Sequence, residues 1–222
     1  ARVVPERPLH PVRQGRIVSH TGLMRDYRME ISSKVIGIRR TTAGHIDDDR
    51  RAKVVKALEV LPKREIIIYS RVRLIRGPRQ LDWIPAIAET AYLVTDLLPV
   101  SIYDDLRGHR IESMADYLQL SGVKAIRSDY RMRSAALPEP FRPKWAGLAH
   151  LSKDEVNALR FLRLESTTCC NLGPVEFSIA DMNPSLYAIK APEVHFELRS
   201  DALQKLSDVP LEKVARRRIG PR

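Results

Sequence analysis

Apolar residues recur at helical spacing directly after the acidic run at residues 47–49. Carboxylates favour the amino terminus of a helix, where they cap free amides and complement the helix dipole, and proline ends a helix. We therefore predict an amphipathic helix over residues 49–61, ended by Pro62. The positions of its apolar face are Val54, Val55, Leu58 and Leu61.

The next stretch, residues 63–76, carries signals of both kinds. Glu65 near its start suits a helix amino terminus, and Gly77-Pro78 directly after it is a helix stop. Residues 66–69 form a β-branched run, which leaves a strand open as the alternative. The length of the stretch and its terminal signals favour the helix.

Two further helices are predicted on the same grounds. Residues 83–98 distribute isoleucine, alanine and tyrosine around a helix that stops before Pro99. Residues 111–120 form a shorter helix, ended near Gly122. Residues 48–135 are therefore expected to be all-helical.

The C-terminal third mixes helix and strand signals. Ser152 and Glu155 form a capping box at the start of a helix. Apolar and polar residues alternate over 175–179 and 194–198, which is typical of half-buried strands. The predicted fold class is α+β, with a mainly helical N-terminal region, an extended N-terminal arm and a smaller mixed helix–strand C-terminal module.

Prolines suggest how the chain is divided. Three prolines near the start predict an extended arm over residues 1–21, which needs a partner to lie on. A proline-rich connector at 137–150 separates a helical domain, residues 22–136, from a mixed module, residues 151–222, that ends in a basic tail.

The charge indicates an anionic partner. The 222 residues include 38 Lys and Arg against 27 Asp and Glu, a net charge of +11. RNA, an anionic membrane surface and the acidic face of another protein all fit this excess. Aromatic residues make up only 6% of the chain, which argues against a surface that stacks single-stranded nucleic acid.

The sequence contains no pattern that names a reaction. Its six histidines lie far apart, and the adjacent Cys169 and Cys170 lack the spacing of a zinc site. Asp104, Asp105 and His109 come closest to a catalytic cluster, but beside a glycine they fit a solvated turn. We therefore expect no catalytic, cofactor or metal site, and a protein that is not an enzyme.

The chain is not expected to cross a membrane. Its most apolar window, residues 83–102, contains Glu89, Asp96 and two prolines. Because residue 1 is alanine, we expect that a transit peptide or an initiator methionine has been removed. The arginine-rich, acid-poor start is typical of organelle-targeted proteins and favours an organelle.

Several short segments resemble the small non-haem subunit (subunit 7 type) of the mitochondrial cytochrome bc1 complex, complex III. These are residues 22–27, 55–62, 65–67, 73–76 and 97–99. The resemblance extends over residues 22–120 and has no counterpart for the C-terminal module.

This resemblance implies a non-catalytic accessory subunit, peripheral on the matrix side of the mitochondrial inner membrane, that supports assembly and electron transport. It implies cytochrome b and the core subunits as partners, possible contact with anionic lipid, and no cofactor. The residues expected at the partner interface are Arg25, Asp26, Tyr27, Arg73, Arg76 and Arg79.

Two other functions stay open. The arginine clusters and the arm also suit a mitochondrial ribosomal protein that neutralises rRNA phosphates. An enzyme whose site is assembled from dispersed residues would use Asp104, Asp105 or His109.

Overall fold

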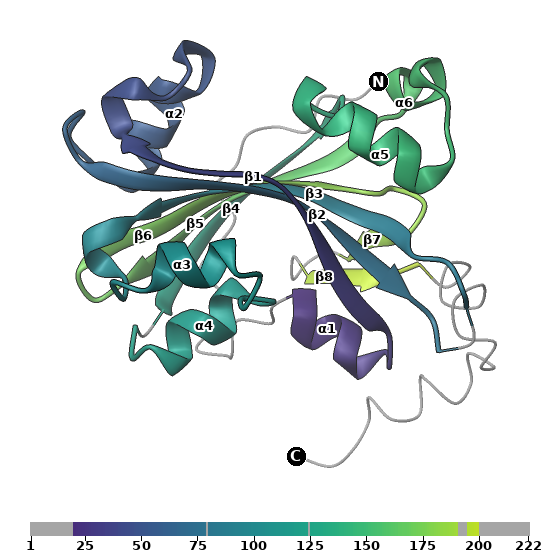
Figure 1. Ribbon diagram of the computed structural model, residues 1–222, viewed down its shortest axis with the longest axis horizontal. Coiled ribbons are helices and arrows are strands. Elements are labelled where there is room, and N and C mark those ends of the chain that lie inside the picture. The colour runs from purple at the N-terminus through teal and green to yellow at the C-terminus, as the bar shows by residue number, and fades with distance from the viewer. Residues whose placement is uncertain (1–19, 79, 124, 191–194, 200–222) are drawn as a thin grey trace.

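The protein is built around one six-stranded antiparallel sheet (Figure 1). The computed structural model describes residues 20–78, 80–123, 125–190 and 195–199. The sheet has the order β1-β2-β3-β6-β5-β4. Its strands are β1 (Glu30–Thr42), β2 (Glu65–Arg76), β3 (Ile84–Val94), β4 (Ala125–Ala135), β5 (Phe161–Cys170) and β6 (Gly173–Met182), while β7 (Tyr187–Lys190) and β8 (His195–Leu198) form a separate pair.

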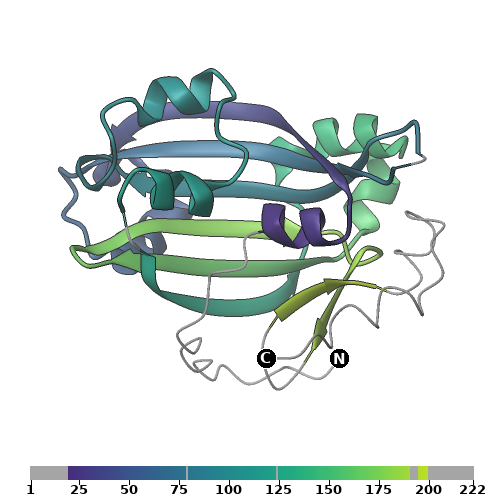
Figure 2. The ribbon, with the colours of Figure 1, turned by 90° about the horizontal axis from the view of Figure 1, so that it is seen from below.

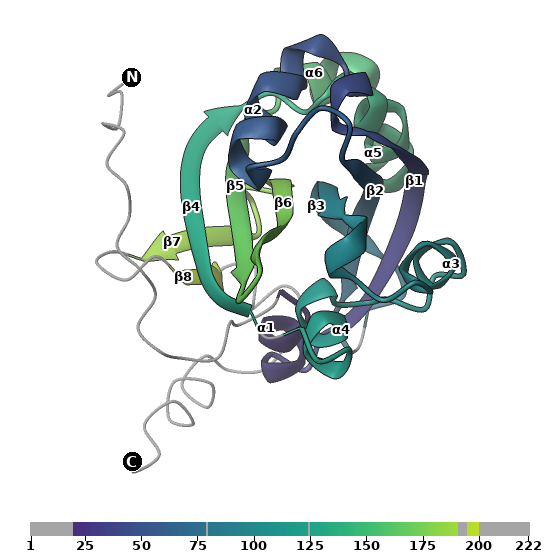
Figure 3. The ribbon, with the colours of Figure 1, turned by 90° about the vertical axis from the view of Figure 1, so that its left-hand side faces the viewer.

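Short helices cover both faces of this sheet. Helices α2, α5 and α6 lie on the face that is uppermost in Figure 1, and α1, α3 and α4 lie on the opposite, lower face (Figures 1 and 3). Figure 2 views the lower face, with the β7–β8 pair beside α1. The helices are α1 (His20–Asp26), α2 (Asp48–Leu58), α3 (Ile102–Arg107), α4 (Met114–Leu120), α5 (Arg142–Ala149) and α6 (Lys153–Ala158), with 3-10 turns η1 (Ala43–His45), η2 (Thr95–Leu97) and η3 (Glu139–Phe141).

The prediction of a mainly helical N-terminal region is wrong. The stretches 63–76 and 83–98, both predicted as helices, contain β2 and β3, so the strand alternative for residues 66–69 is the correct one. Helices cover both faces of these central strands, and nearly every position is therefore buried. Continuous burial removes the alternation that identifies a strand in a sequence.

Other predicted elements are confirmed. The helix expected at 49–61 is α2, and the one expected at 111–120 is the shorter α4. The capping box of Ser152 and Glu155 is formed at the start of α6. The alternating stretch 175–179 lies in β6, and residues 195–198 of the second stretch form β8, while residue 194 lies outside the described residues.

Strands from both sides of the proline-rich segment share one sheet, because β3 pairs with β6. The segment itself, expected as an extended connector, forms η3 and α5. The division of the chain into domains stays a prediction. The predicted arm lies outside the described residues except for His20 and Thr21, which begin α1, and so does the basic tail. In the described part of the chain, no helix is long and apolar enough to span a membrane.

Two apolar clusters attach helices to the upper face. Trp145 of α5 meets Phe161 of β5 edge to face, with 4.9 Å between the ring centroids. On the other half of this face, Leu58 of α2 packs with Tyr92 and Phe177 from the central strands. The two helical covers of this face therefore have separate apolar cores.

We expect Trp145→Ala to lower the free energy of unfolding by about 3–5 kcal/mol, because the indole is fully buried and its removal leaves a cavity against Phe161. Urea denaturation followed by circular dichroism measures this change. Leu172→Ala is the control, since Leu172 is exposed and its loss should change stability by less than about 0.5 kcal/mol. Equal effects of the two substitutions would contradict the packing described.

Candidate functional site

Two arginines of β2 point into the interior instead of the solvent. Arg71 and Arg73 are separated by one residue, so their side chains leave the strand on the same, lower face. Their residues are only 1% and 5% exposed. Arg71 pairs in register with Glu89 of β3, which places a carboxylate directly beside the two guanidinium groups. Because buried charges are costly unless paired, this arrangement calls for a specific reason.

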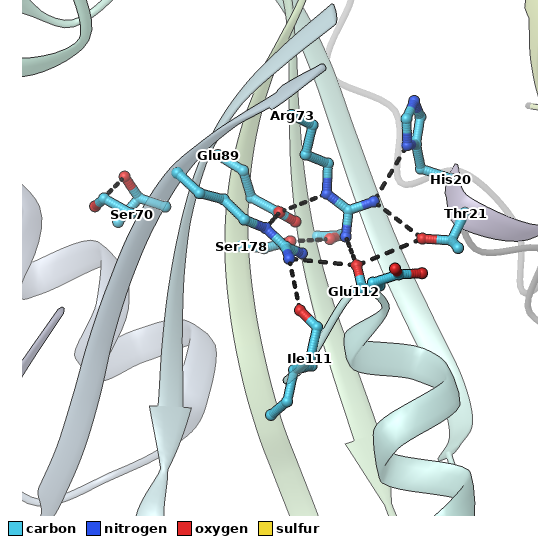
Figure 4. A network of polar contacts seen from close by, with 11 residues as sticks. His20, Thr21, Ser70, Arg73, Glu89, Ile111, Glu112 and Ser178 are labelled. Atoms are coloured by element: carbon cyan, nitrogen blue, oxygen red, sulfur yellow. Dashed lines mark hydrogen bonds and ion pairs between the residues drawn. The ribbon is translucent and has the colours of Figure 1, made fainter. Parts of the chain in front are cut away.

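Glu89 forms ion pairs with both arginines, and Figure 4 shows it beside Arg73. Its Oε2 accepts hydrogen bonds from Nε of Arg71 at 2.7 Å and from Nε of Arg73 at 3.1 Å. The remaining guanidinium donors reach main-chain carbonyls before α4: Arg71 donates to Ile111 at 3.3 Å, and Arg73 donates to Glu112 at 3.1 Å. The loop before α4 therefore contacts the outer side of both arginines.

On the side of α1, uncharged side chains surround Arg73. Arg73 Nη1 lies 3.1 Å from Nδ1 of His20 and 3.4 Å from Oγ1 of Thr21, and His20 Nε2 lies 2.6 Å from the hydroxyl of Tyr187. Burial, together with the Arg73 charge, lowers the pKa of His20 well below its usual value. A neutral imidazole accepts from Arg73 at Nδ1 and donates from Nε2 to Tyr187.

The carboxylates of the cluster differ in their protonation. Burial opposes ionisation of Glu89, but the charges of Arg71 and Arg73 outweigh it and lower its pKa to about 2. Burial and repulsion from Glu89 raise the pKa of Glu176, on β6, to about 7. Glu176 is therefore largely protonated below pH 7. In that state two arginines are balanced by one carboxylate, and the interior carries one excess positive charge.

A small cavity adjoins this cluster. It has a volume of about 170 Å³ and lies between β1, Tyr69 and the loop before α4. The Tyr69 ring lies 5.2 Å from the Arg71 guanidinium carbon, and the carbonyl of Ile111, another lining residue, accepts from the same arginine. Glu112, whose carbonyl accepts from Arg73, lines the cavity as well. The excess charge and the adjoining space together suit a small anion. No group of side chains in the described residues has the composition of a metal site.

The structure places the predicted interface residues in different surroundings. Arg73 alone belongs to the buried cluster. Arg25 is exposed and forms ion pairs at 3.5 Å with Glu112 and Asp116. Arg76 pairs with Glu30 and lies over the ring of Trp83, at 4.6 Å from its centroid.

Of the other predicted interface residues, Tyr27 is partly buried. The side chain of Asp26 is not described, and Arg79 lies outside the described residues. A contact of any of the six with another protein stays a prediction.

The residues considered for catalysis lie on and after α3. Asp104 and Asp105 are on this helix, and His109 is in the turn that follows it. Asp105 accepts a hydrogen bond from the hydroxyl of Tyr117 at 3.0 Å.

The sequence reading did not identify the other members of the cluster, Arg71, Glu89, Glu176, His20 and Tyr187. One local signal was available, because an Arg-x-Arg pair inside the apolar run of β2 places two charges on one strand face. The pairing of His20 with Tyr187 has no local signal, since 167 residues separate them in the sequence.

Comparison with known proteins identifies the fold. No family model and no curated protein matches the sequence. Solved structures do match: a GntR-family transcriptional regulator from Bacillus cereus has a TM-score of 0.54 at 20% identity, over 74% of this chain and 99% of that one. The ligand-binding domain of a putative GntR-family regulator from Bordetella bronchiseptica has a TM-score of 0.50 at 14% identity, over 77% and 89%. The C-terminal domain of a histidine utilization repressor from Pseudomonas syringae pv. tomato has a TM-score of 0.52 at 13% identity, over 75% and 100%.

These comparisons overturn the resemblance to a complex III subunit. Residues 55–62 and 65–76, which carried much of it, form the end of a helix, a turn and a sheet strand instead of two helices. The expectations that depended on it are wrong as well: a mitochondrial inner-membrane location, a role in the respiratory chain, and cytochrome b, the core subunits and lipid as partners. The ribosomal alternative with rRNA as partner has no support in these matches either.

The three solved structures are described as transcriptional regulators or their domains, and none of them as an enzyme. The prediction that this chain is not an enzyme agrees with these descriptions. What the comparisons identify is a shared fold, which in this chain has helices on both faces of a six-stranded antiparallel sheet.

Proposed function

We propose that this chain is the ligand-sensing domain of a transcriptional regulator and that its ligand is a small organic anion bound at Arg71 and Arg73. The observation that carries the proposal is the charge imbalance of the buried cluster, where one ionised carboxylate, Glu89, serves two guanidinium groups. A structure that used these charges only to stabilise itself would gain from a matching carboxylate. The comparison with the ligand-binding domain from Bordetella bronchiseptica supports the same assignment.

Binding has a direct route to a conformational change. The arginines donate to the main-chain carbonyls of Ile111 and Glu112, which are uncharged acceptors. An anionic group forms stronger hydrogen bonds with guanidinium than a carbonyl does, so a bound ligand displaces these carbonyls. The loop before α4 then moves, and α4 is attached to it through the Ser113 side chain, which caps the helix. Ligand binding at the buried site therefore changes the position of the loop and of α4, which cover the site.

We expect Arg73→Gln to weaken ligand binding by about 10- to 100-fold, because it removes a charge-assisted hydrogen bond at the centre of the site. A panel of small carboxylates and phosphate esters is first screened by thermal shift, and the best ligand is then titrated by calorimetry. Arg107→Gln is the control, since Arg107 is an exposed arginine on α3. Unchanged affinity in a folded Arg73→Gln variant would contradict the assignment.

The affinity for the anion should fall as the pH rises through about 7. Below that pH Glu176 is protonated and the cluster keeps its excess positive charge, whereas above it the second carboxylate cancels the excess. Glu176→Gln removes the titrating group, so this variant should bind with the same affinity at pH 6 and pH 8. Titration calorimetry at both values measures the effect. A pH dependence that persists in Glu176→Gln would show that another group is responsible.

A further inference from the structure

A second and larger cavity lies on the opposite, upper face of the sheet. Its volume is about 470 Å³, within the roughly 300–1,000 Å³ range of small-molecule pockets. It occupies the gap between α2 and the η3–α5 segment, the two helical covers of that face. The proposed function does not use this space, and the buried arginine cluster lies on the far side of the same strands.

The floor of this upper cavity is made of buried, paired charges. Asp181 of β6 is 1% exposed and is held by Arg163 of β5 through two hydrogen bonds, at 2.7 and 3.0 Å. Arg163 also donates to the carbonyl of Ala136 at 3.0 Å. This pair is complete in itself, so it fixes the floor and contributes no net charge.

Glu165, the second carboxylate on the floor of the cavity, is paired with two basic side chains. Glu165 is 6% exposed, and its Oε1 accepts from Lys53 of α2 and from Arg133 of β4, the latter at 3.4 Å. Lys53 and Arg133 are partly or largely exposed and approach from different walls of the cavity. One positive charge therefore stays unbalanced at the point where they meet.

Arg142 is a further cation in the lining of the cavity. Arg142, in the first turn of α5, donates Nε to the carbonyl of Leu137 at 2.8 Å, which fixes the direction of its guanidinium group. Within the described part of the chain, no carboxylate lies at ion-pair distance from Arg142. In all, five basic and four acidic side chains line the cavity, so it carries an excess of one positive charge.

The remaining wall is mainly apolar, with Glu139 as its one charged residue. Pro138, Pro140 and Phe141 of the proline-rich segment line one side, and Ile179 contributes from the sheet. A cavity with a cationic side and an apolar side fits a ligand that has both a negatively charged group and a hydrophobic part. A multivalent metal ion does not fit, because the net charge of the lining would repel it.

We infer that the upper cavity is a second binding site, for a small organic anion such as an aromatic phosphate or carboxylate. Its charged group lies between Lys53, Arg133 and Arg142, and its apolar part lies against Phe141. The inference is independent of the proposed function, although the same strands carry both sites. Thr90 of β3 lines the upper cavity, and its neighbour Glu89 belongs to the cluster on the lower face.

The experiment uses phenyl phosphate as the probe and Arg73→Gln as the starting protein, so that the cluster on the lower face is weakened. Calorimetric titration of this protein should give saturable binding at millimolar concentrations or below. Adding Arg142→Gln or Lys53→Gln should weaken that binding about tenfold or more, since each removes a charged donor. Adding Lys56→Gln should leave it unchanged, because Lys56 is exposed on the same helix and does not line the cavity. Phenol, which lacks the charge, should not bind.

Absence of saturable binding to the folded Arg73→Gln protein would overturn the second site. Equal binding before and after adding Arg142→Gln would also overturn it. Arg142→Gln decides the result on its own if Lys53→Gln impairs folding, because Arg142 has no buried carboxylate partner to leave unpaired. Binding lost only on Arg73→Gln in the otherwise unaltered chain would locate the probe at the lower cluster, which supports the proposed function and rejects the second site.

Discussion

The hydrogen bonds from Arg71 and Arg73 to one carboxylate oxygen of Glu89 set the polar groups that the elements on the lower face have to supply. They place three charges in the interior, at the centre of two adjacent strands. Their desolvation requires every remaining donor to be satisfied, which explains why a loop supplies carbonyls from one side and a neutral histidine closes the other. The elements that cover the lower face therefore supply hydrogen-bonding groups as well as apolar contacts.

The same strands contribute residues to a different site on each face of the sheet. Alternate residues of β3 and β6 point to the buried cluster below and to the upper cavity above, so neighbouring positions serve separate sites. The helices on the two faces belong to separate apolar clusters, each of which also includes strand residues. A change in one helical cover can therefore leave the others in place, which suits a domain that responds to a ligand.

The sequence predicted elements whose signals are local. The cap at Ser152, the amphipathic pattern of α2 and the alternation in β6 were read correctly, because each depends on residues a few positions apart. The helices predicted over β2 and β3 were wrong, since burial on both faces hides the alternation of a central strand. Among the site residues the sequence predicts a role only for Arg73, and that role is contact with a partner protein. His20 and Tyr187 lie 167 residues apart and are brought together only by the fold.

The central claim is that Arg71, Arg73 and Glu89 are charged for the sake of a ligand and not for the sake of the fold. Its most direct test is the free energy of unfolding of a variant with all three replaced by methionine, measured in urea. Buried ion pairs replaced by apolar residues of similar volume are often neutral or stabilising. We expect a stability equal to or above that of the original protein. A loss of about 3 kcal/mol or more would assign the three charges to the fold and contradict the account.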